Sequence, residues 1–187
     1  MLNDKCTVDA PDRPAWRAWL AAHHPQKEGI WLIMYKKASG QQRMTYDDVV
    51  EEALCFGWID SLPRRLDDAR SLLYISPRKK GSVWSALNKR RIEKLAAAGL
   101  IAPAGQAKID AARLDGSWDA LNSSDALEIP ADLAAALAAH PAAERHFNAF
   151  PPGVRKQLLQ QLAAAKRPET RQQRVARIVE RAAENSR

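Results

Sequence analysis

The chain has few of the residues that form disulfides and metal sites. Its 187 residues include two cysteines, Cys6 and Cys55, which are far apart and belong to no CxxC motif. The four histidines comprise an adjacent pair and a pair six positions apart, so no two imidazoles share a helix face at i, i+4 spacing. The sequence therefore excludes a disulfide framework, favours a reducing compartment, and predicts no metal and no cofactor.

Long apolar runs are missing as well. The longest apolar segments fall far below the roughly 20 residues that a membrane-spanning helix needs. The first six residues lack the charged and then apolar layout of an export signal. A cytoplasmic protein without a membrane span is the expectation.

Signatures of common enzyme classes are also absent. The sequence contains no GxxxxGKS or GxxxxGKT phosphate loop, no GxGxxG turn, no GxSxG nucleophile elbow and no HExxH zinc motif. No reaction is indicated by any motif, and a non-enzymatic protein is favoured.

The chain does have a large apolar fraction and an uneven positive charge. Apolar residues make up 46% of it, which is enough to bury a substantial core. The formal net charge of +7 is concentrated in two segments. Residues 64–94 hold ten Lys or Arg against three Asp or Glu, and residues 155–187 hold nine against three. Such clusters can bind nucleic acid or other anionic partners, although solvated helix faces have the same composition.

Residues 1–120 show the pattern of an α+β domain. Thr45 and Asp48 form a capping-box pattern that predicts a helix over 46–56. The apolar run 30–35 predicts a buried strand, and two further apolar runs flank a polar turn as in a β-hairpin. A small antiparallel sheet with packed helices is therefore predicted. The hairpin strands are expected over 58–62 and 72–75, and other helices begin at Asp12, Ser85 and Pro103.

Residues 121–187 are predicted to form an all-helical C-terminal region. A linker without sustained periodicity is placed within 118–128, before the first of its helices. Each later segment opens with a proline, which suits the first turn of a helix. The helices are expected to begin at Pro130, Pro141, Pro152 and Pro168, and the last one leaves Arg171, Arg174, Arg177 and Arg181 largely outward.

A candidate binding site lies where polar side chains stand among strongly apolar ones. Trp58 and Trp84 are flanked by polar groups, and a half-buried tryptophan is a common pocket wall. Asp60 and Arg78 should lie at the open end of the hairpin, near the anion-attracting start of the next helix. A structural salt link between these two residues explains part of the pattern equally well. The predicted ligand-binding set is Trp58, Asp60, Arg78, Lys79, Trp84, Ser85 and Asn88.

These motifs resemble the bacterial YdeI/OmpD-associated family, also labelled bacteriocin-protection proteins. The resemblance extends over nearly the whole length and implies a YjbR/CyaY-like α+β front with a helical C-terminal region. It also implies a link to resistance against bacteriocins or cationic antimicrobial peptides, and it assigns no catalytic residue. The motifs that carry it include residues 53–60, Pro77-Arg78-Lys79, Trp84-Ser85 with Asn88, and Glu169-Thr170-Arg171.

Three functions remain open from the sequence. The first is a non-enzymatic cytoplasmic protein of the envelope-stress or antimicrobial-resistance type, which binds an anionic small molecule or peptide group in the candidate pocket. The second is nucleic-acid binding through residues 64–94 and the last helix. The third is an enzyme on a phosphate-bearing substrate, with Asp60 and Asp67 as metal or base groups and Arg78 or Lys79 as the anion clamp.

Overall fold

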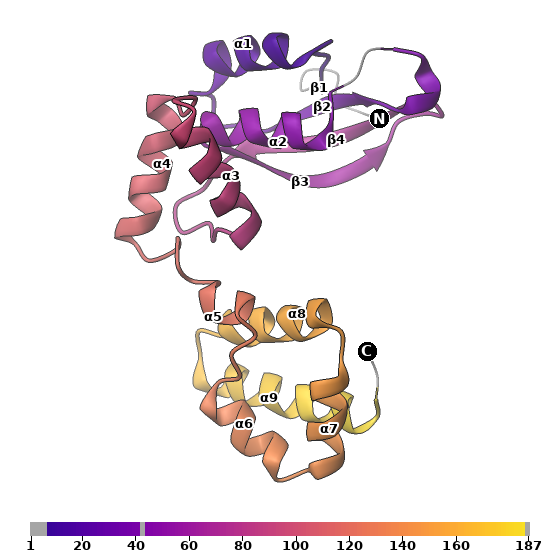
Figure 1. Ribbon diagram of the computed structural model, residues 1–187, viewed down its shortest axis with the longest axis vertical. Coiled ribbons are helices and arrows are strands. Elements are labelled where there is room, and N and C mark those ends of the chain that lie inside the picture. The colour runs from indigo at the N-terminus through magenta and orange to yellow at the C-terminus, as the bar shows by residue number, and fades with distance from the viewer. Residues whose placement is uncertain (1–6, 42–43, 186–187) are drawn as a thin grey trace. The chain divides into compact units, whose positions relative to one another are not determined.

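The computed structural model describes residues 7–41 and 44–185, and Cys6 lies outside these ranges. The chain divides into two compact units, one ending at Asp119 and the other beginning at Ala120 (Figure 1). Each unit has its own hydrophobic core. The α+β class with a helical C-terminal region is thereby confirmed.

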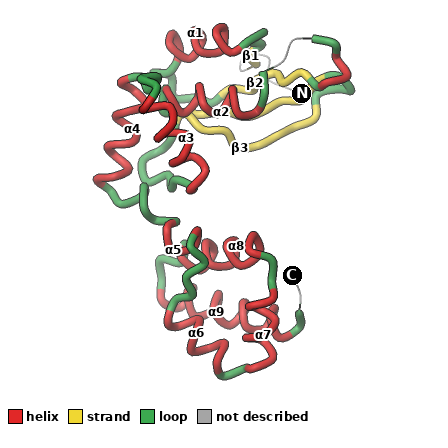
Figure 2. The backbone as a smooth tube through the Cα atoms, viewed as in Figure 1, coloured by secondary structure: helices red, strands yellow, loops and turns green. Residues whose placement is uncertain are grey.

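The first unit combines a sheet with helices that pack on it (Figure 2). Its strands are β1 (Thr7–Val8), β2 (Ile30–Tyr35), β3 (Trp58–Arg65) and β4 (Arg70–Pro77). Its α-helices are α1 (Arg13–His23), α2 (Tyr46–Cys55), α3 (Ala86–Ala97) and α4 (Pro103–Leu114), and a short 3₁₀ helix covers Lys37–Ser39.

The sheet is mixed, with the strand order β1-β2-β4-β3. β3 and β4 form the predicted antiparallel hairpin, and β4 pairs antiparallel with β2. β1 runs parallel to β2, with Thr7 opposite Trp31, so the sheet is mixed where an antiparallel one was predicted. Two residues are too few to show the alternation that identifies a strand, which is why the sequence did not reveal β1.

Local hydrogen bonds fix the helix starts where the sequence predicts them. Asp12 accepts the N–H of Ala15 at 2.8 Å and begins α1. Thr45 and Asp48 form the expected capping box, since each side chain accepts a backbone N–H of the other, at 3.1 and 2.9 Å. α2 is therefore held at its first turn by its own sequence.

Ion pairs join α1 to α2. Glu52 is only 3% exposed and accepts hydrogen bonds from Arg13 Nε and Arg17 Nη1, both at 2.7 Å. Burial alone would lower the pKa of these arginines, but the hydrogen bonds to Glu52 raise it above its ordinary value. A buried carboxylate is tolerated here because two guanidinium groups neutralise it.

The second unit consists of helices around a separate core. Leu133, Phe147 and Leu162 are fully buried in it, and Ile178 contributes from the last helix. The predicted linker contains a short helix that was not predicted, because four residues are too few to show helical periodicity. The helices are α5 (Asn122–Asp125), α6 (Ala131–Ala138), α7 (Pro141–Ala149), α8 (Pro152–Ala163) and α9 (Pro168–Ala183).

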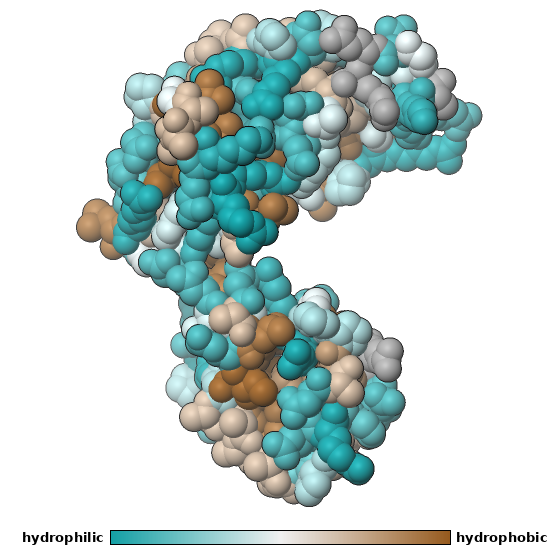
Figure 3. All heavy atoms as spheres, viewed as in Figure 1, coloured by the Kyte–Doolittle hydropathy of each residue, from teal (hydrophilic) through white to brown (hydrophobic). Residues whose placement is uncertain are grey.

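Hydrophilic residues cover most of the visible face of the first unit (Figure 3). A few large apolar side chains are nevertheless exposed, and the most open is Leu114 at the end of α4, with 91% of its surface accessible. Scattered apolar residues of this kind are ordinary on protein surfaces. Exposed apolar residues therefore do not indicate a binding site on this surface, and its pockets and charged residues are the remaining candidates.

Candidate functional site

Arg78 is a buried cation that forms no ion pair within the described part of the chain. It follows the end of β4, and only 4% of its surface is exposed. Its guanidinium carbon lies 3.6 Å from the centroid of the Trp84 ring, and Nη2 donates to the carbonyl oxygen of Val83 at 2.8 Å. Its Nε is buried and has no hydrogen-bond partner. Among the residues that the structure describes, no carboxylate forms an ion pair with Arg78.

Burial lowers the pKa of Arg78 to about 10, while the negative charge of Asp60 opposes the change. The guanidinium group still carries its charge at neutral pH. Removal of a cation from water without a partner is unfavourable, and such groups are normally paired. Arg78 therefore has an unused capacity to bind an anion.

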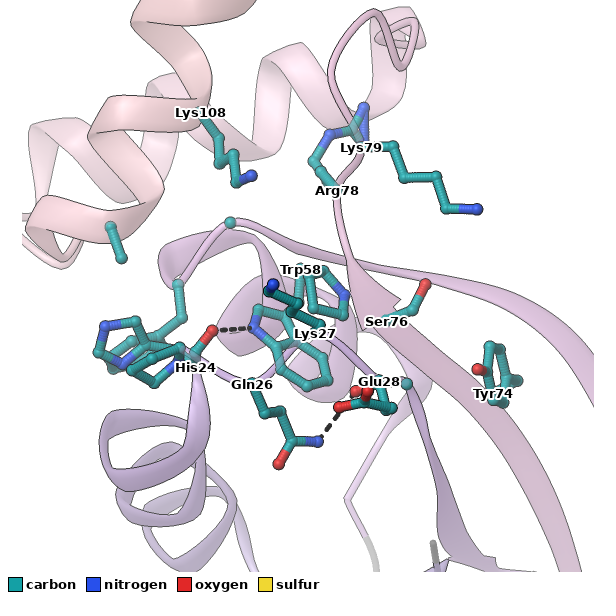
Figure 4. Close-up of a pocket in the computed structure, with 16 residues that line it drawn as sticks. His24, Gln26, Lys27, Glu28, Trp58, Tyr74, Ser76, Arg78, Lys79 and Lys108 are labelled. Carbon is teal, nitrogen blue, oxygen red and sulfur yellow. Dashed lines mark hydrogen bonds between the residues drawn. The ribbon is translucent and has the colours of Figure 1, made fainter.

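A pocket of about 600 Å³ opens beside Arg78. Trp58 lines it and is held in place by a hydrogen bond from Nε1 to the carbonyl oxygen of His24, at 3.2 Å (Figure 4). Tyr74 and Ser76, two positions apart on one face of β4, add hydroxyl groups. Among the described lining residues Glu28 is the one carboxylate, whereas the cations are Lys27, Arg78, Lys79 and Lys108.

A second pocket of about 470 Å³ lies on the Trp84 side of Arg78. Arg78, Lys79 and Lys108 line both pockets, so the two hollows share a basic wall. Lys80 adds a further cation to the second one, and Asp115 is its lining carboxylate. The charged residues that line the two pockets are therefore mainly positive.

The close approach of α4 to the end of α2 brings Lys108 to the shared wall. Ala102 donates its N–H to the carbonyl oxygen of Cys55 at 3.0 Å. Gly105 permits this approach, because a Cβ at that position would lie 2.2 Å from the same oxygen. Figure 4 shows the side chain of Lys108 extending from α4 toward the pocket. A backbone contact between helices thus sets the position of a basic side chain.

The structure brings together four of the seven predicted residues. Trp58, Arg78 and Lys79 line the first pocket, and Trp84 joins Arg78 and Lys79 in the second. Trp58 and Trp84 are more buried than predicted, at 0% and 1% exposure. Both tryptophan rings are therefore packed behind the pocket surface and expose little of their own surface to a ligand.

The other three residues have local partners elsewhere. Asp60 accepts a hydrogen bond from the Tyr46 hydroxyl at 2.5 Å and lines a separate hollow of about 360 Å³. Ser85 accepts the N–H of Asn88 at 3.3 Å and caps α3. Asn88 in turn accepts from Arg91 Nη1 at 2.9 Å. The predicted salt link between Asp60 and Arg78 does not form as an ion pair, although the charge of Asp60 acts on Arg78 from a distance.

The carboxylate pair of the enzyme hypothesis is not assembled. Asp67 lies at the hairpin turn, where it accepts hydrogen bonds from the backbone N–H groups of Ala69 and Arg70 at 2.9 and 2.7 Å. Its pKa is lowered mainly by the side-chain hydrogen bond from Arg70. Within the described ranges, no three potential metal-ligating side chains cluster. Asp67 therefore has a turn-forming role away from the basic wall.

Lys27 and Lys108 are two of the five charged lining residues that the sequence did not identify, the others being Lys80, Glu28 and Asp115. Lys108 lies on a predicted helix with no motif around it, and only the isolated Gly105 hinted at close packing there. Lys27 stands in the loop between α1 and β2. Both reach the pocket through tertiary contacts.

Comparison with known protein families divides the chain in a similar place. Residues 8–108 match the family model described as Domain of unknown function (DUF8412), and residues 126–185 match the model described as Bacteriocin-protection, YdeI or OmpD-Associated. The first of these models spans more than half of the chain, so the chain belongs to the DUF8412 family. Its residues 126–185 are a region of the YdeI/OmpD-associated, bacteriocin-protection type. No curated protein and no solved structure matches it.

The family match covers less of the chain than the resemblance suggested. The YdeI/OmpD-associated model is confined to the helical unit, whereas the motifs at 53–60 and 77–88 lie inside the domain of unknown function. The YjbR/CyaY-like front stays a prediction. In the part of the chain that the structure describes, no helix is long and apolar enough to cross a membrane.

Proposed function

We propose that the first unit binds an anionic small molecule, or the anionic group of a peptide, beside Arg78. The observation that carries the proposal is the burial of this guanidinium group without an ion-pair partner among the described residues. An anion in either adjacent pocket would contact the basic wall formed by Arg78, Lys79 and Lys108. In a partly desolvated site, such charge-assisted hydrogen bonds are stronger than those on an open surface.

The family gives this binding activity a biological setting. The family model that matches residues 126–185 is described as bacteriocin protection. We therefore place the anion site in a non-enzymatic cytoplasmic protein of antimicrobial-peptide or envelope-stress resistance. In this proposal the first unit binds the ligand, and the helical unit performs the protective role that its family model describes. The assembled basic wall and the separated aspartates favour binding over catalysis.

Nucleic-acid binding receives less support from the structure. Several cations of residues 64–94 are paired with carboxylates of the same unit, which reduces the positive potential available to phosphates. The pairs are Arg65 with Asp68, Arg70 with Asp67, Lys89 with Asp119, Arg91 with Asp47, and Lys94 with Glu51. Absence of binding to single-stranded DNA at low salt would remove this alternative.

Thermal unfolding with a panel of anions tests the proposal. Phosphate, sulfate, citrate and glutamate sample the relevant charges and shapes, and at least one is expected to raise the melting temperature of the wild type by about 3 °C or more. Arg78→Met should lose this stabilisation, because it keeps the apolar stem and removes the charge. Arg90→Met, on the exposed surface of α3, removes one positive charge elsewhere and should respond as the wild type does. Equal stabilisation of the wild type and Arg78→Met would reject the site.

A further inference from the structure

The helical unit has a basic hollow of its own. A pocket of about 470 Å³ lies between α8 and α9. Arg174, Arg177 and Arg181 line it from positions i, i+3 and i+7 of α9, which share one helix face. Its floor includes the buried side chains of Leu158 and Ile178.

The arginines of α9 differ in how their charges are satisfied. Arg171 forms a two-pronged ion pair with Asp132, at 2.6 and 2.9 Å. Arg174 instead donates to the backbone carbonyl oxygen of Gln161, which fixes its direction without neutralising its charge. Among the described residues, neither Arg174 nor Arg177 forms an ion pair with a carboxylate. Two charged guanidinium groups thus border one pocket and are open to an external anion.

The chemistry of this face suits phosphate better than a single carboxylate. Each guanidinium group presents parallel N–H donors that match two oxygens of one phosphate. A phosphate monoester carries close to two negative charges and three acceptor oxygens, so it can engage two neighbouring arginines at once. The described residues that line the pocket include no carboxylate to compete with such a ligand.

We infer that the pocket between α8 and α9 binds a phosphate-bearing ligand through Arg174 and Arg177. The site is independent of the basic wall around Arg78, because it lies in the other unit and shares no lining residue with it. A soluble phosphate and the monoester headgroup of a lipid such as phosphatidic acid offer the same chemistry, and the experiment separates them.

Titration of the full chain with inorganic pyrophosphate provides the test. Arg78→Met serves as the background, so that the first unit does not contribute binding. Calorimetry is expected to show pyrophosphate binding that weakens at least tenfold in Arg177→Gln. The loss should be smaller in Arg177→Lys, which keeps the positive charge but lacks the parallel N–H donors of a guanidinium group. The NMR signals of the Arg174 and Arg177 Nε–H groups should shift with pyrophosphate, and that of the ion-paired Arg171 should shift less.

Arg145→Gln is the matched control, because it removes one exposed arginine from α7, outside the pocket. It should change the affinity by less than twofold. A parallel arm measures co-sedimentation with vesicles that contain phosphatidic acid, a phosphate monoester, with phosphatidylcholine vesicles as the neutral reference. Pyrophosphate binding assigns a soluble ligand, and vesicle binding that depends on Arg177 without pyrophosphate binding assigns a headgroup. Absence of both, or equal losses in Arg145→Gln and Arg177→Gln, would overturn the inference.

Discussion

At the scale of single residues, Arg78 is where this chain departs from the usual rule that buried charges are paired. Its stacking on Trp84 and its hydrogen bond to Val83 compensate only part of the lost hydration. If this position served only the stability of the fold, an apolar side chain of the same volume would stabilise it more than a buried arginine does. The arrangement is consistent with a side chain retained for ligand binding.

Arg78→Met is therefore expected to change the free energy of unfolding by less than about 1 kcal/mol, or to increase it, because relief from charge burial offsets the lost cation–π contact. Urea denaturation at pH 7, followed by tryptophan fluorescence, measures this. A loss of about 3 kcal/mol or more would instead identify Arg78 as a structural residue.

Tyr46 offers a second test at this scale. The pKa of Tyr46 is raised to about 12, mainly by burial and secondly by the hydrogen bond of its hydroxyl to Asp60. Because the folded-state pKa exceeds the ordinary value of 10, this group stabilises the fold below pH 10, and the contribution is lost as the pH rises toward 12. Asp60→Asn should lower the pKa of Tyr46, as measured by ultraviolet difference titration against Tyr46→Phe. An unchanged titration curve would show that the hydrogen bond does not form.

At the scale of elements, the docking of α4 on the end of α2 determines the shape of the basic wall. Gly105 and Ala102 both contact the carbonyl oxygen of Cys55, so the helix start and the end of α2 move together. Lys108 follows one turn later on α4 and lines both pockets. Packing at Gly105 is thus coupled to the geometry of the proposed site.

Gly105→Ala should destabilise the first unit by about 1–3 kcal/mol, because the added methyl group meets backbone atoms that cannot rotate away. It should also weaken anion binding by displacing Lys108. Gly153→Ala is the control, since no atom lies within 4 Å of a Cβ there, and it should leave stability unchanged or slightly improved. Equal stability of Gly105→Ala and the wild type would contradict the close packing.

The elements that the sequence predicted well are those with local signals. The Thr45 capping box, the proline-initiated helices and the apolar run of β2 depend on residues close in sequence. The bond from Tyr46 to Asp60 and the approach of Lys108 depend on tertiary contacts, so sequence spacing alone did not show them. Trp58 and Arg78 came together as expected because hairpin pairing sets Trp58 opposite Pro77.

At the scale of the whole molecule, the two cores share no residue. All six tryptophans lie at or before residue 118, within the first unit. Tryptophan fluorescence therefore reports on the first unit alone, whereas far-ultraviolet circular dichroism reports on the helices of both.

Phe147→Ala should lower the stability of the helical unit by about 3–5 kcal/mol, because it removes a fully buried ring from the second core. The circular dichroism transition is expected to begin at lower urea concentration, while the fluorescence transition stays where it is in the wild type. Coincident shifts of both signals would show that the two units unfold as one cooperative system.

Experimental electron density of a crystal soaked in selenate, recorded at the selenium absorption edge, tests the central claim most directly. The anomalous signal locates the anion without reference to any variant. We predict a peak within hydrogen-bonding distance of the Arg78 guanidinium group, on the wall shared with Lys79 and Lys108. Density that shows Arg78 paired with a carboxylate of the chain, and no anion beside it, would contradict the account.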